Sequence, residues 1–195
     1  MADDDAWTAY YEANEDRPPR DFLFDVLGRF PTPGQAIDLG CGTGVDTAAM
    51  LERGWSVFAT DAQQEAIDRL LRRVGADVPR LRTQRTAMEE VELPLADLVW
   101  ASFSLFFCDP ARFADVWARI GRAIVPGGRF AGQLLGERDT WAPDNDISSF
   151  SEAQARALFD GWTLERFEEE ENDGEACDGP KHWHVFHAVA SAPSS

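Results

Sequence analysis

The sequence contains few cysteines, few basic residues and no long apolar run. Three of its 195 residues are cysteine, and no two of them form a CxxC pair. A disulfide framework or a zinc site built on paired thiols is therefore not expected, and the thiols should be reduced. No apolar run approaches the roughly 20 residues of a membrane-spanning helix, and the amino terminus has acids where a signal peptide has positive charge. We expect a cytoplasmic protein without a membrane anchor.

Acidic residues outnumber basic ones. The chain carries 35 Asp and Glu against 18 Lys and Arg, a formal net charge of -17, and its bases are scattered. Because binding to phosphate backbones draws on clustered bases, nucleic acids and anionic membranes are disfavoured as partners. Solubility alone explains an acidic surface, so the charge selects neither a substrate nor an oligomeric state.

Apolar segments and turn signals alternate along the chain in the manner of one α/β domain. The pattern predicts helices over 21–30, 45–53, 63–74, 110–124 and 149–160, the last capped by Ser149 or Ser151. It predicts strands over 36–39, 56–60, 80–85, 96–101 and 129–135. The segments 162–170 and 181–190, joined by turn-rich residues, should form an antiparallel hairpin. We expect residues 1–20 to form a lid, 21–190 the domain and 191–195 a loose tail.

The segment Ile37-Asp-Leu-Gly-Cys-Gly-Thr-Gly44 ends a strand and opens a helix, where free N–H groups and the helix dipole favour a ligand. Dinucleotide sites read G-x-G-x-x-G, but here Val45 stands at the third glycine position, which disfavours NAD. Asp61 ends the next strand, where its carboxylate can accept hydrogen bonds from both hydroxyls of a ribose. The two features together are more specific than either alone.

With these features the chain resembles the class I S-adenosylmethionine-dependent methyltransferases over nearly its whole length. The glycine loop is similar to the family's motif I, Asp61 to its ribose-binding acid, and Val125-Pro-Gly-Gly-Arg-Phe130 to the turn before its fifth strand. The resemblance implies a doubly wound, seven-stranded α/β sheet of order 3-2-1-4-5-7-6, with strand 7 antiparallel and helices on both faces. Segments 101–109 and 181–187 further resemble small bacterial enzymes grouped with tellurite-resistance methyltransferases.

The resemblance implies S-adenosylmethionine as the cofactor. Asp38 would orient the loop and help to hold the amino group of the methionine part, and Arg17 or Tyr11 would meet its carboxylate from the lid. A solvated surface arginine is the competing interpretation of Arg17. Ser102, just beyond the fourth strand, would face the sulfonium end. The implied cofactor residues are Tyr11, Arg17, Asp38, Gly40, Cys41, Gly42, Gly44, Asp61, Ala62, Ala87, Met88 and Ser102.

The sequence departs from the family pattern after the third strand. Many members place an acid there that receives the adenine amino group, whereas this chain has Thr86. Adenine is assigned instead to packing against Ala87 and Met88, with Glu89 as a possible replacement for the acid. Met88 could equally be a core residue.

Methyl transfer from a sulfonium is an in-line displacement, so an enzyme must mainly align the acceptor and exclude water. An oxygen or protonated nitrogen acceptor also needs a general base, while a thiolate or other soft anion needs only orientation. All three histidines lie in the last predicted strand, whose beginning should meet the cofactor edge. We predict His184 or His182, on one face by alternation, as the base. Histidines hydrogen-bonded within the sheet are the alternative.

Candidate acceptor residues come from three segments: Tyr10, Phe106, Arg138 and Trp141. Arg138 could hold a carboxylate, or could simply pair with Asp139. Phe106, with neighbouring phenylalanines, would wall the pocket, although at least one of these rings should be core. A metal site made from the histidine strand, Cys177 and the acids at 168–171 is not expected, because no second thiol lies at ligand spacing.

The leading interpretation is a methyltransferase acting on a small molecule. A non-catalytic S-adenosylmethionine-binding or regulatory protein with the same fold is the main alternative, and an NAD-dependent oxidoreductase is opposed by Val45. Whether nitrogen, oxygen, sulfur or a heavier chalcogen accepts the methyl group stays open.

Overall fold

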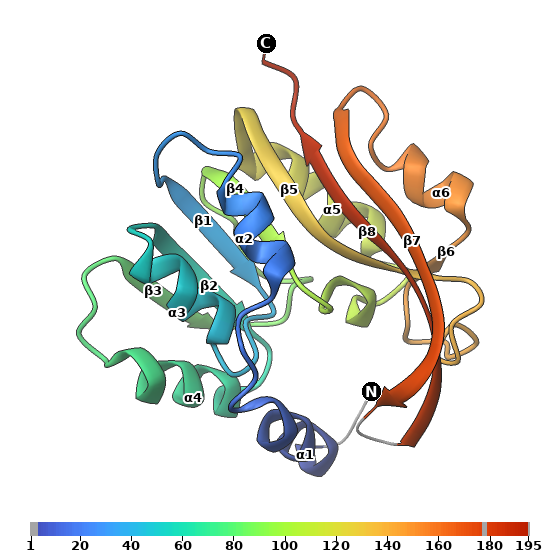
Figure 1. Ribbon diagram of the computed structural model, residues 1–195, viewed down its shortest axis with the longest axis horizontal. Helices are drawn as coiled ribbons and strands as arrows, with labels where there is room; N and C mark the ends of the chain where they lie inside the picture. Colours follow the sequence, from blue (N-terminus) through green and yellow to red (C-terminus); the bar gives the residue numbers. More distant parts are fainter. Residues whose placement is uncertain (1–3, 177–178, 195) are drawn as a thin grey trace.

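The computed structural model describes residues 4–176 and 179–194. Its centre is a mixed sheet of order β3-β2-β1-β4-β5-β8-β7, with a short β6 beside β5 (Figure 1). The strands are β1 Gln35–Leu39, β2 Ser56–Asp61, β3 Leu81–Arg85, β4 Ala96–Ala101, β5 Ile124–Gly136, β6 Ser149–Phe150, β7 Thr163–Ala176 and β8 Gly179–Ser191. The helices are α1 Asp4–Asn14, α2 Asp21–Leu27, α3 Val45–Glu52, α4 Gln64–Val74, α5 Phe113–Ala123 and α6 Glu152–Ala157, with a 3-10 turn η1 at Leu105–Phe107.

The predicted strand order is confirmed. β3, β2, β1, β4 and β5 pair in parallel, and β8 runs antiparallel to both β5 and β7. Parallel pairing follows from the βα alternation, because each helix returns the chain to the same edge of the sheet. The carboxyl ends of β1, β2 and β4 therefore meet at one edge, on the side where α1 lies (Figure 1).

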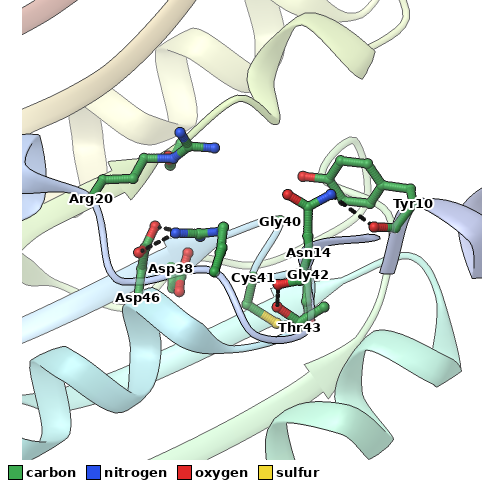
Figure 2. A pocket seen from close by; sticks show the side chains of 11 residues that line it. Tyr10, Asn14, Arg20, Asp38, Gly40, Cys41, Gly42, Thr43 and Asp46 are labelled. Atoms are coloured by element: carbon green, nitrogen blue, oxygen red, sulfur yellow. Dashed lines mark hydrogen bonds and ion pairs between the residues drawn. The ribbon is translucent and has the colours of Figure 1, made fainter. Parts of the chain in front are cut away.

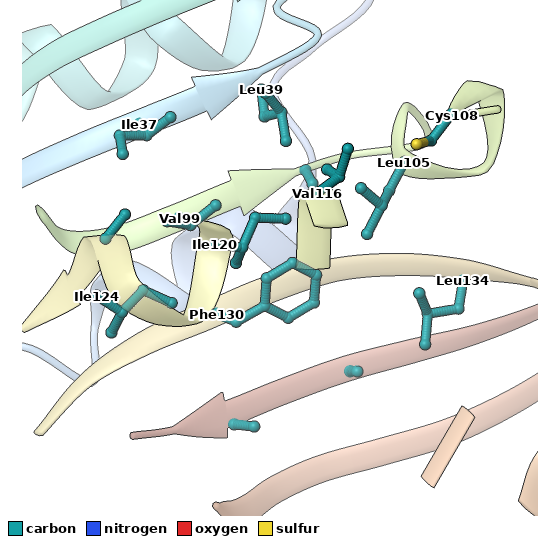
Figure 3. Packing of buried hydrophobic residues seen from close by; sticks show 14 of the residues in the cluster. Ile37, Leu39, Val99, Leu105, Cys108, Val116, Ile120, Ile124, Phe130 and Leu134 are labelled. Atoms are coloured by element: carbon teal, nitrogen blue, oxygen red, sulfur yellow. The ribbon is translucent and has the colours of Figure 1, made fainter. Parts of the chain in front are cut away.

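The two faces of the sheet bury different helices, because side chains alternate along each strand. Ile37 and Val99 face the cluster that contains Val116 and Ile120 of α5, as Figure 3 shows. The opposite face buries a second cluster, which α2, α3 and α4 cover: Leu23, Val26, Ala36, Met50, Ile67, Leu70, Leu98 and Trp100. The largely apolar character of β1 and β4 thus reflects burial on both sides.

Several predicted boundaries were wrong. α5 spans Phe113–Ala123 rather than 110–124, and β5 begins at Ile124 rather than at residue 129, because Ile124 pairs with Ala96 before an irregularity that contains the predicted turn.

Ser149 does not cap a helix: Ser149 and Phe150 form β6, which pairs with the end of β5, and the helix begins only at Glu152. Ser151 is the N-cap, in a capping box with Gln154.

The hairpin is also longer than predicted, because the turn-rich residues 171–176 remain paired with β8, for example Asp173 with His182. These polar residues lie on the exposed outer strand, where pairing with β8 satisfies their backbone groups without requiring apolar side chains. Within the described chain, no helix has both the length and the apolar character of a membrane span.

Candidate functional site

The glycine loop joins β1 to α3 at the carboxyl edge of the sheet. Gly40 and Gly44 have φ values of +81° and +77°, in the left-handed region that side chains rarely adopt. A Cβ atom on Gly40 would lie 2.5 Å from the Cβ of Ser104, and one on Gly44 would lie 2.5 Å from a methyl carbon of Leu70. Backbone conformation and close approach therefore both require glycine at these positions.

The structure brings Asp61 directly to the glycine loop. One carboxylate oxygen accepts the backbone N–H of Gly42 at 3.0 Å, and the other accepts the N–H of Gln63 at 3.0 Å and the Tyr11 hydroxyl at 3.4 Å. Burial raises the pKa of Asp61, and the hydrogen bonds from Gln63 and Gly42 oppose that shift. The acid predicted to hold a ribose thus lies beside the loop predicted to hold the rest of the nucleoside.

Asp38 lies beneath the loop and is only 2% exposed. The Thr47 hydroxyl donates a hydrogen bond of 2.5 Å to its carboxylate. Burial raises the pKa of Asp38 to about 7, because the charged form loses its hydration. A cationic ligand group nearby would favour the charged carboxylate.

The pKa of Asp38 leads to a prediction on stability. The unfolded chain releases this proton near pH 4 and the folded chain only near pH 7, so folding stability should fall as the pH rises between these values. Asp38→Asn removes this penalty and keeps an acceptor for Thr47. The melting temperature of Asp38→Asn minus that of the wild type should therefore increase from pH 5 to pH 7 and stay constant above pH 7. Asp115→Asn, on the exposed face of α5, serves as the control; parallel curves for Asp38→Asn and the wild type would contradict the assignment.

A polar pocket opens between the loop and the N-terminal segment (Figure 2). Its lining combines predicted cofactor residues with others: Tyr10, Asn14, Arg17, Arg20, Asp38, Gly40, Cys41, Gly42, Thr43, Asp46 and Ser102. In Figure 2, Arg20 lies across the pocket from Tyr10 and Asn14. Tyr10, which was predicted to contact the acceptor, thus lines the same pocket as the residues predicted to bind the cofactor.

The two arginines of this pocket differ in their partners. Arg17 is partly exposed, but it makes a two-pronged ion pair with Asp46, with N–O distances of 3.0 and 3.1 Å, and also donates to the carbonyl of Pro18, so its terminal nitrogens are already engaged. Arg20 stacks over the Phe103 ring at 4.4 Å, and its buried Nε has no hydrogen-bond partner. Burial, aided by Arg17, lowers the pKa of Arg20.

Ser102 carries a second buried, unpartnered polar atom in the pocket, its hydroxyl oxygen. Such atoms cost free energy unless something completes their hydrogen bonds, so they indicate where a polar ligand group would bind. Sequence reasoning named Ser102 but missed Arg20. The signal was present in Arg17-Pro-Pro-Arg20, but only the fold shows which arginine is already paired.

Tyr11 is placed differently from the expectation. It is only 1% exposed, and its hydroxyl lies on Asp61 at the ribose end of the site, not at the methionine end. Burial, and then Asp61, raise its pKa.

The residues after β3 lie beside Asp61. The N–H of Thr86 donates to the backbone carbonyl of Asp61 at 2.8 Å, while Ala62 is exposed and Ala87 is half-buried. Met88 packs against the core cluster under α5. Glu89 accepts the N–H of Asp109 at 2.9 Å, so its carboxylate holds the loop after η1. The expected adenine-side residues therefore border the site, with Glu89 engaged elsewhere.

The predicted histidines do not line this pocket. Buried His184 accepts the N–H of Arg138 at Nδ1 and contacts Glu169 at Nε2, so both ring nitrogens are occupied. His182 is exposed between Asp173 and Glu171, whose hydrogen bonds raise its pKa, so less of its ring is in the unprotonated form that can accept a proton. Both His182 and His184 are thus hydrogen-bonded within the sheet, which is the alternative to a general base.

Arg138 and the acids of β7 form an exposed ion-pair network. Arg138 contacts Glu169 at 2.6 Å and Glu171 at 2.7 Å. The expected alternative partner, Asp139, pairs instead with buried Lys181. Glu169, Glu171 and His184 place their ligand atoms within 4.8 Å of one another, but Arg138 already forms ion pairs with both glutamates. Cys177, the thiol of the metal alternative, lies outside the described residues.

Aromatic rings from distant segments pack together beyond the pocket. The ring centroids of Trp7 of α1 and Phe107 are 5.0 Å apart, and those of Phe107 and Trp141 are 6.0 Å apart. Trp141 in turn contacts Trp183 of β8 at 5.6 Å. Phe106 is 2% exposed and forms the buried base of this group, the core role expected for one of these rings. Of the predicted acceptor residues, Phe106 and Trp141 thus belong to this aromatic group, whereas Arg138 belongs to the ion-pair network with Glu169 and Glu171.

Comparisons with known proteins agree with this geometry. Residues 36–128 match the family described as a methyltransferase domain. An uncharacterised methyltransferase of Mycobacterium tuberculosis H37Rv is 33% identical over 137 residues, which cover 67% of this chain and 50% of that protein. Trans-aconitate 2-methyltransferase of Sinorhizobium medicae is 32% identical over 142 residues, 66% of this chain and 50% of that protein. The chain belongs to the class I S-adenosylmethionine-dependent methyltransferases. It spans about half the length of the curated relatives it matches.

Solved methyltransferases share the fold. TehB from Haemophilus influenzae superposes with a TM-score of 0.74 at 14% identity, covering 89% of this chain and 62% of TehB. The 1,6-didemethyltoxoflavin-N1-methyltransferase of Burkholderia thailandensis, solved with its substrate and S-adenosylhomocysteine, superposes with a TM-score of 0.72 at 19% identity, covering 97% of this chain and 86% of that protein. The chain therefore has the fold of these proteins over almost all of its length.

Proposed function

We propose that this protein binds S-adenosylmethionine and transfers its methyl group to a small molecule. The observation that carries the proposal is one continuous site: the glycine loop, Asp61 beside it, and two unpartnered polar atoms, on Arg20 and Ser102, at its other end. These groups suit the cofactor, which has ribose hydroxyls at its middle and a charged amino-acid group at one end.

Each end of the site is assigned to one part of the cofactor. Asp61 accepts the ribose hydroxyls and releases the Tyr11 hydroxyl, which occupies one of its oxygens. Arg20 rather than Arg17 holds the methionine carboxylate, because Arg17 is already paired with Asp46. Asp38 and Ser102 lie on the same pocket and serve the methionine amino group.

Bound S-adenosylmethionine supplies a methyl group on a positively charged sulfur. The chain's task is then to orient the acceptor and exclude water. The rings of Trp7, Phe107, Trp141 and Trp183 form a continuous aromatic group from α1 to β8, and we infer that this group excludes water from the acceptor. The side chains that line the polar pocket include no histidine. We infer an acceptor that is already a strong nucleophile and needs alignment more than proton removal.

Small-molecule acceptors also agree with the relatives, among them trans-aconitate 2-methyltransferase and the 1,6-didemethyltoxoflavin enzyme.

We place the protein in the cytoplasm and treat residues 1–20 as its lid. In support of a lid, the N-terminal segment is tied to α4 by the hydrogen bond from Thr8 of α1 to Glu65 and by the ion pair between Glu15 and Arg69. A non-catalytic cofactor-binding protein is the second candidate, and it is favoured because neither His182 nor His184 is among the residues that line the pocket. Screening acceptors for release of S-adenosylhomocysteine separates the two candidates.

Calorimetric titration with S-adenosylmethionine, S-adenosylhomocysteine and NAD tests the cofactor. The first two should bind and NAD should not; binding of NAD alone would overturn the proposal. Arg20→Met should weaken S-adenosylmethionine about 10- to 100-fold, the effect of one lost charged hydrogen bond. Arg17→Met should mainly lower the melting temperature, because it leaves Asp46 buried without its cation. The opposite ranking of the two variants would reassign the carboxylate to Arg17.

A further inference from the structure

Phe103 has a strained backbone at the edge of the cofactor pocket. It follows Ser102 at the end of β4 and has a φ of 52°, the one positive φ of a non-glycine residue in the described chain. A bulky side chain in this conformation costs free energy and persists only where surrounding contacts enforce it. The contacts that enforce it are therefore informative.

A chain of hydrogen bonds holds the Phe103 backbone. Its N–H donates to the Oε1 of Gln133 on β5 at 3.0 Å, and the Nε2 of Gln133 contacts the Nδ1 of His187 on β8 at 3.2 Å. The Nε2 of His187 contacts a carboxylate oxygen of Glu170 on β7 at 2.8 Å. These hydrogen bonds thus run from the segment after β4 across three strands, β5, β8 and β7, and end at the exposed Glu170.

The first donor fixes the direction of every later hydrogen bond. Because a backbone N–H can only donate, the Gln133 oxygen must face Phe103 and its NH2 group must donate to His187. The His187 Nδ1 is then an acceptor, and its proton sits on Nε2, which donates to Glu170. Gln133 is only 1% exposed, so water does not replace these partners.

The conformation of Phe103 decides where its two neighbours point. Ser102 places its unpartnered hydroxyl in the pocket beside Arg20. Ser104, on the other side, turns under the glycine loop, where its hydroxyl donates to the carbonyl of Leu39 at 2.5 Å. The Phe103 ring itself supports the Arg20 guanidinium. The position of the Ser102 hydroxyl, the hydrogen bond from Ser104 to Leu39 and the support of Arg20 thus all depend on one backbone conformation.

We propose that Gln133 and His187 are positioning residues of the cofactor site: by holding Phe103 in its left-handed conformation, they place Ser102 and Arg20 for the methionine end of the cofactor. The inference rests on the proposed function. Neither residue lines the pocket, so each acts through Phe103.

Three variants separate hydrogen bonding from packing. Gln133→Leu fills a similar volume without either hydrogen bond. Gln133→Glu still offers a carboxylate oxygen to the Phe103 N–H, and its second oxygen can accept a hydrogen bond from the Nδ1–H tautomer of His187, so the hydrogen bond that holds Phe103 survives. His187→Phe keeps a ring against Phe22 and Phe103 but removes both nitrogens. Ile120→Val, on the buried face of α5, lowers stability without touching the site and is the matched control.

Calorimetry with S-adenosylhomocysteine and amide hydrogen exchange at Phe103 test the proposal together. Gln133→Leu should bind S-adenosylhomocysteine about tenfold more weakly than the wild type and lose protection of the Phe103 amide, while Gln133→Glu stays within about twofold. His187→Phe should lie between them, and Ile120→Val should bind as the wild type does. Wild-type affinity in Gln133→Leu, or equal losses in Gln133→Leu and Gln133→Glu, would overturn the inference alone. Failure of the wild type to bind S-adenosylhomocysteine would overturn the proposed function as well.

Discussion

Asp61→Ala should abolish measurable cofactor binding, with an affinity loss of at least about 100-fold. Two ribose hydroxyls donating to one charged carboxylate contribute about 1.5–3 kcal/mol each, and alanine replaces neither. The same substitution frees the Gly42 N–H and the Tyr11 hydroxyl, so the loop and α1 lose their common anchor. Calorimetry with S-adenosylmethionine measures the effect.

The control for this variant is Asp68→Ala on α4. Asp68 is exposed and accepts a hydrogen bond only from Gln64, so its loss should leave both affinity and melting temperature unchanged. Circular dichroism must show that Asp61→Ala remains folded. A folded Asp61→Ala protein that binds S-adenosylmethionine as tightly as the wild type would remove Asp61 from the site.

Lys181→Met should lower the melting temperature by roughly 10 °C. The Lys181 side chain is 1% exposed and its partner Asp139 is fully buried, with the ammonium 3.6 Å from the centre of the Trp141 ring. Removing one partner of a buried pair costs about 3–5 kcal/mol because the other charge remains buried. In a chain of this size each kcal/mol shifts the melting temperature by about 2–4 °C.

Two further variants test the reason for this loss. Arg156→Met breaks the exposed pair with Glu152 and should cost less than about 1 kcal/mol. Adding Asp139→Leu to Lys181→Met should restore part of the lost stability. Recovery should stay incomplete, because Asp139 also accepts the backbone N–H groups of His184 and Trp141. A Lys181→Met protein that melts with the wild type would show that water reaches this pair.

Most of the fold could be predicted because its signals are local. Alternating strands and helices imply a parallel sheet, and the glycine segment and Asp61 each end a strand, so topology brings them to one edge. β6 was missed because Ser149 and Phe150 gain their strand conformation only from pairing with β5. The extended hairpin was missed for the same reason, since its turn-rich residues are held by β8.

The chemistry of the site divides along the same line. The sequence by itself determined the alternation of strands and helices, the glycine loop and the acid that ends the next strand, because each depends on residues close together in the chain or on a short repeating pattern. The order of the strands followed from the family resemblance. Only the tertiary structure decided that Arg17 is paired and Arg20 is not, that His184 is buried against Glu169, and that Gln133 and His187 hold Phe103. Those outcomes depend on which side chains from distant segments reach one another first, and side-chain pairing across a sheet leaves no periodic trace in the sequence.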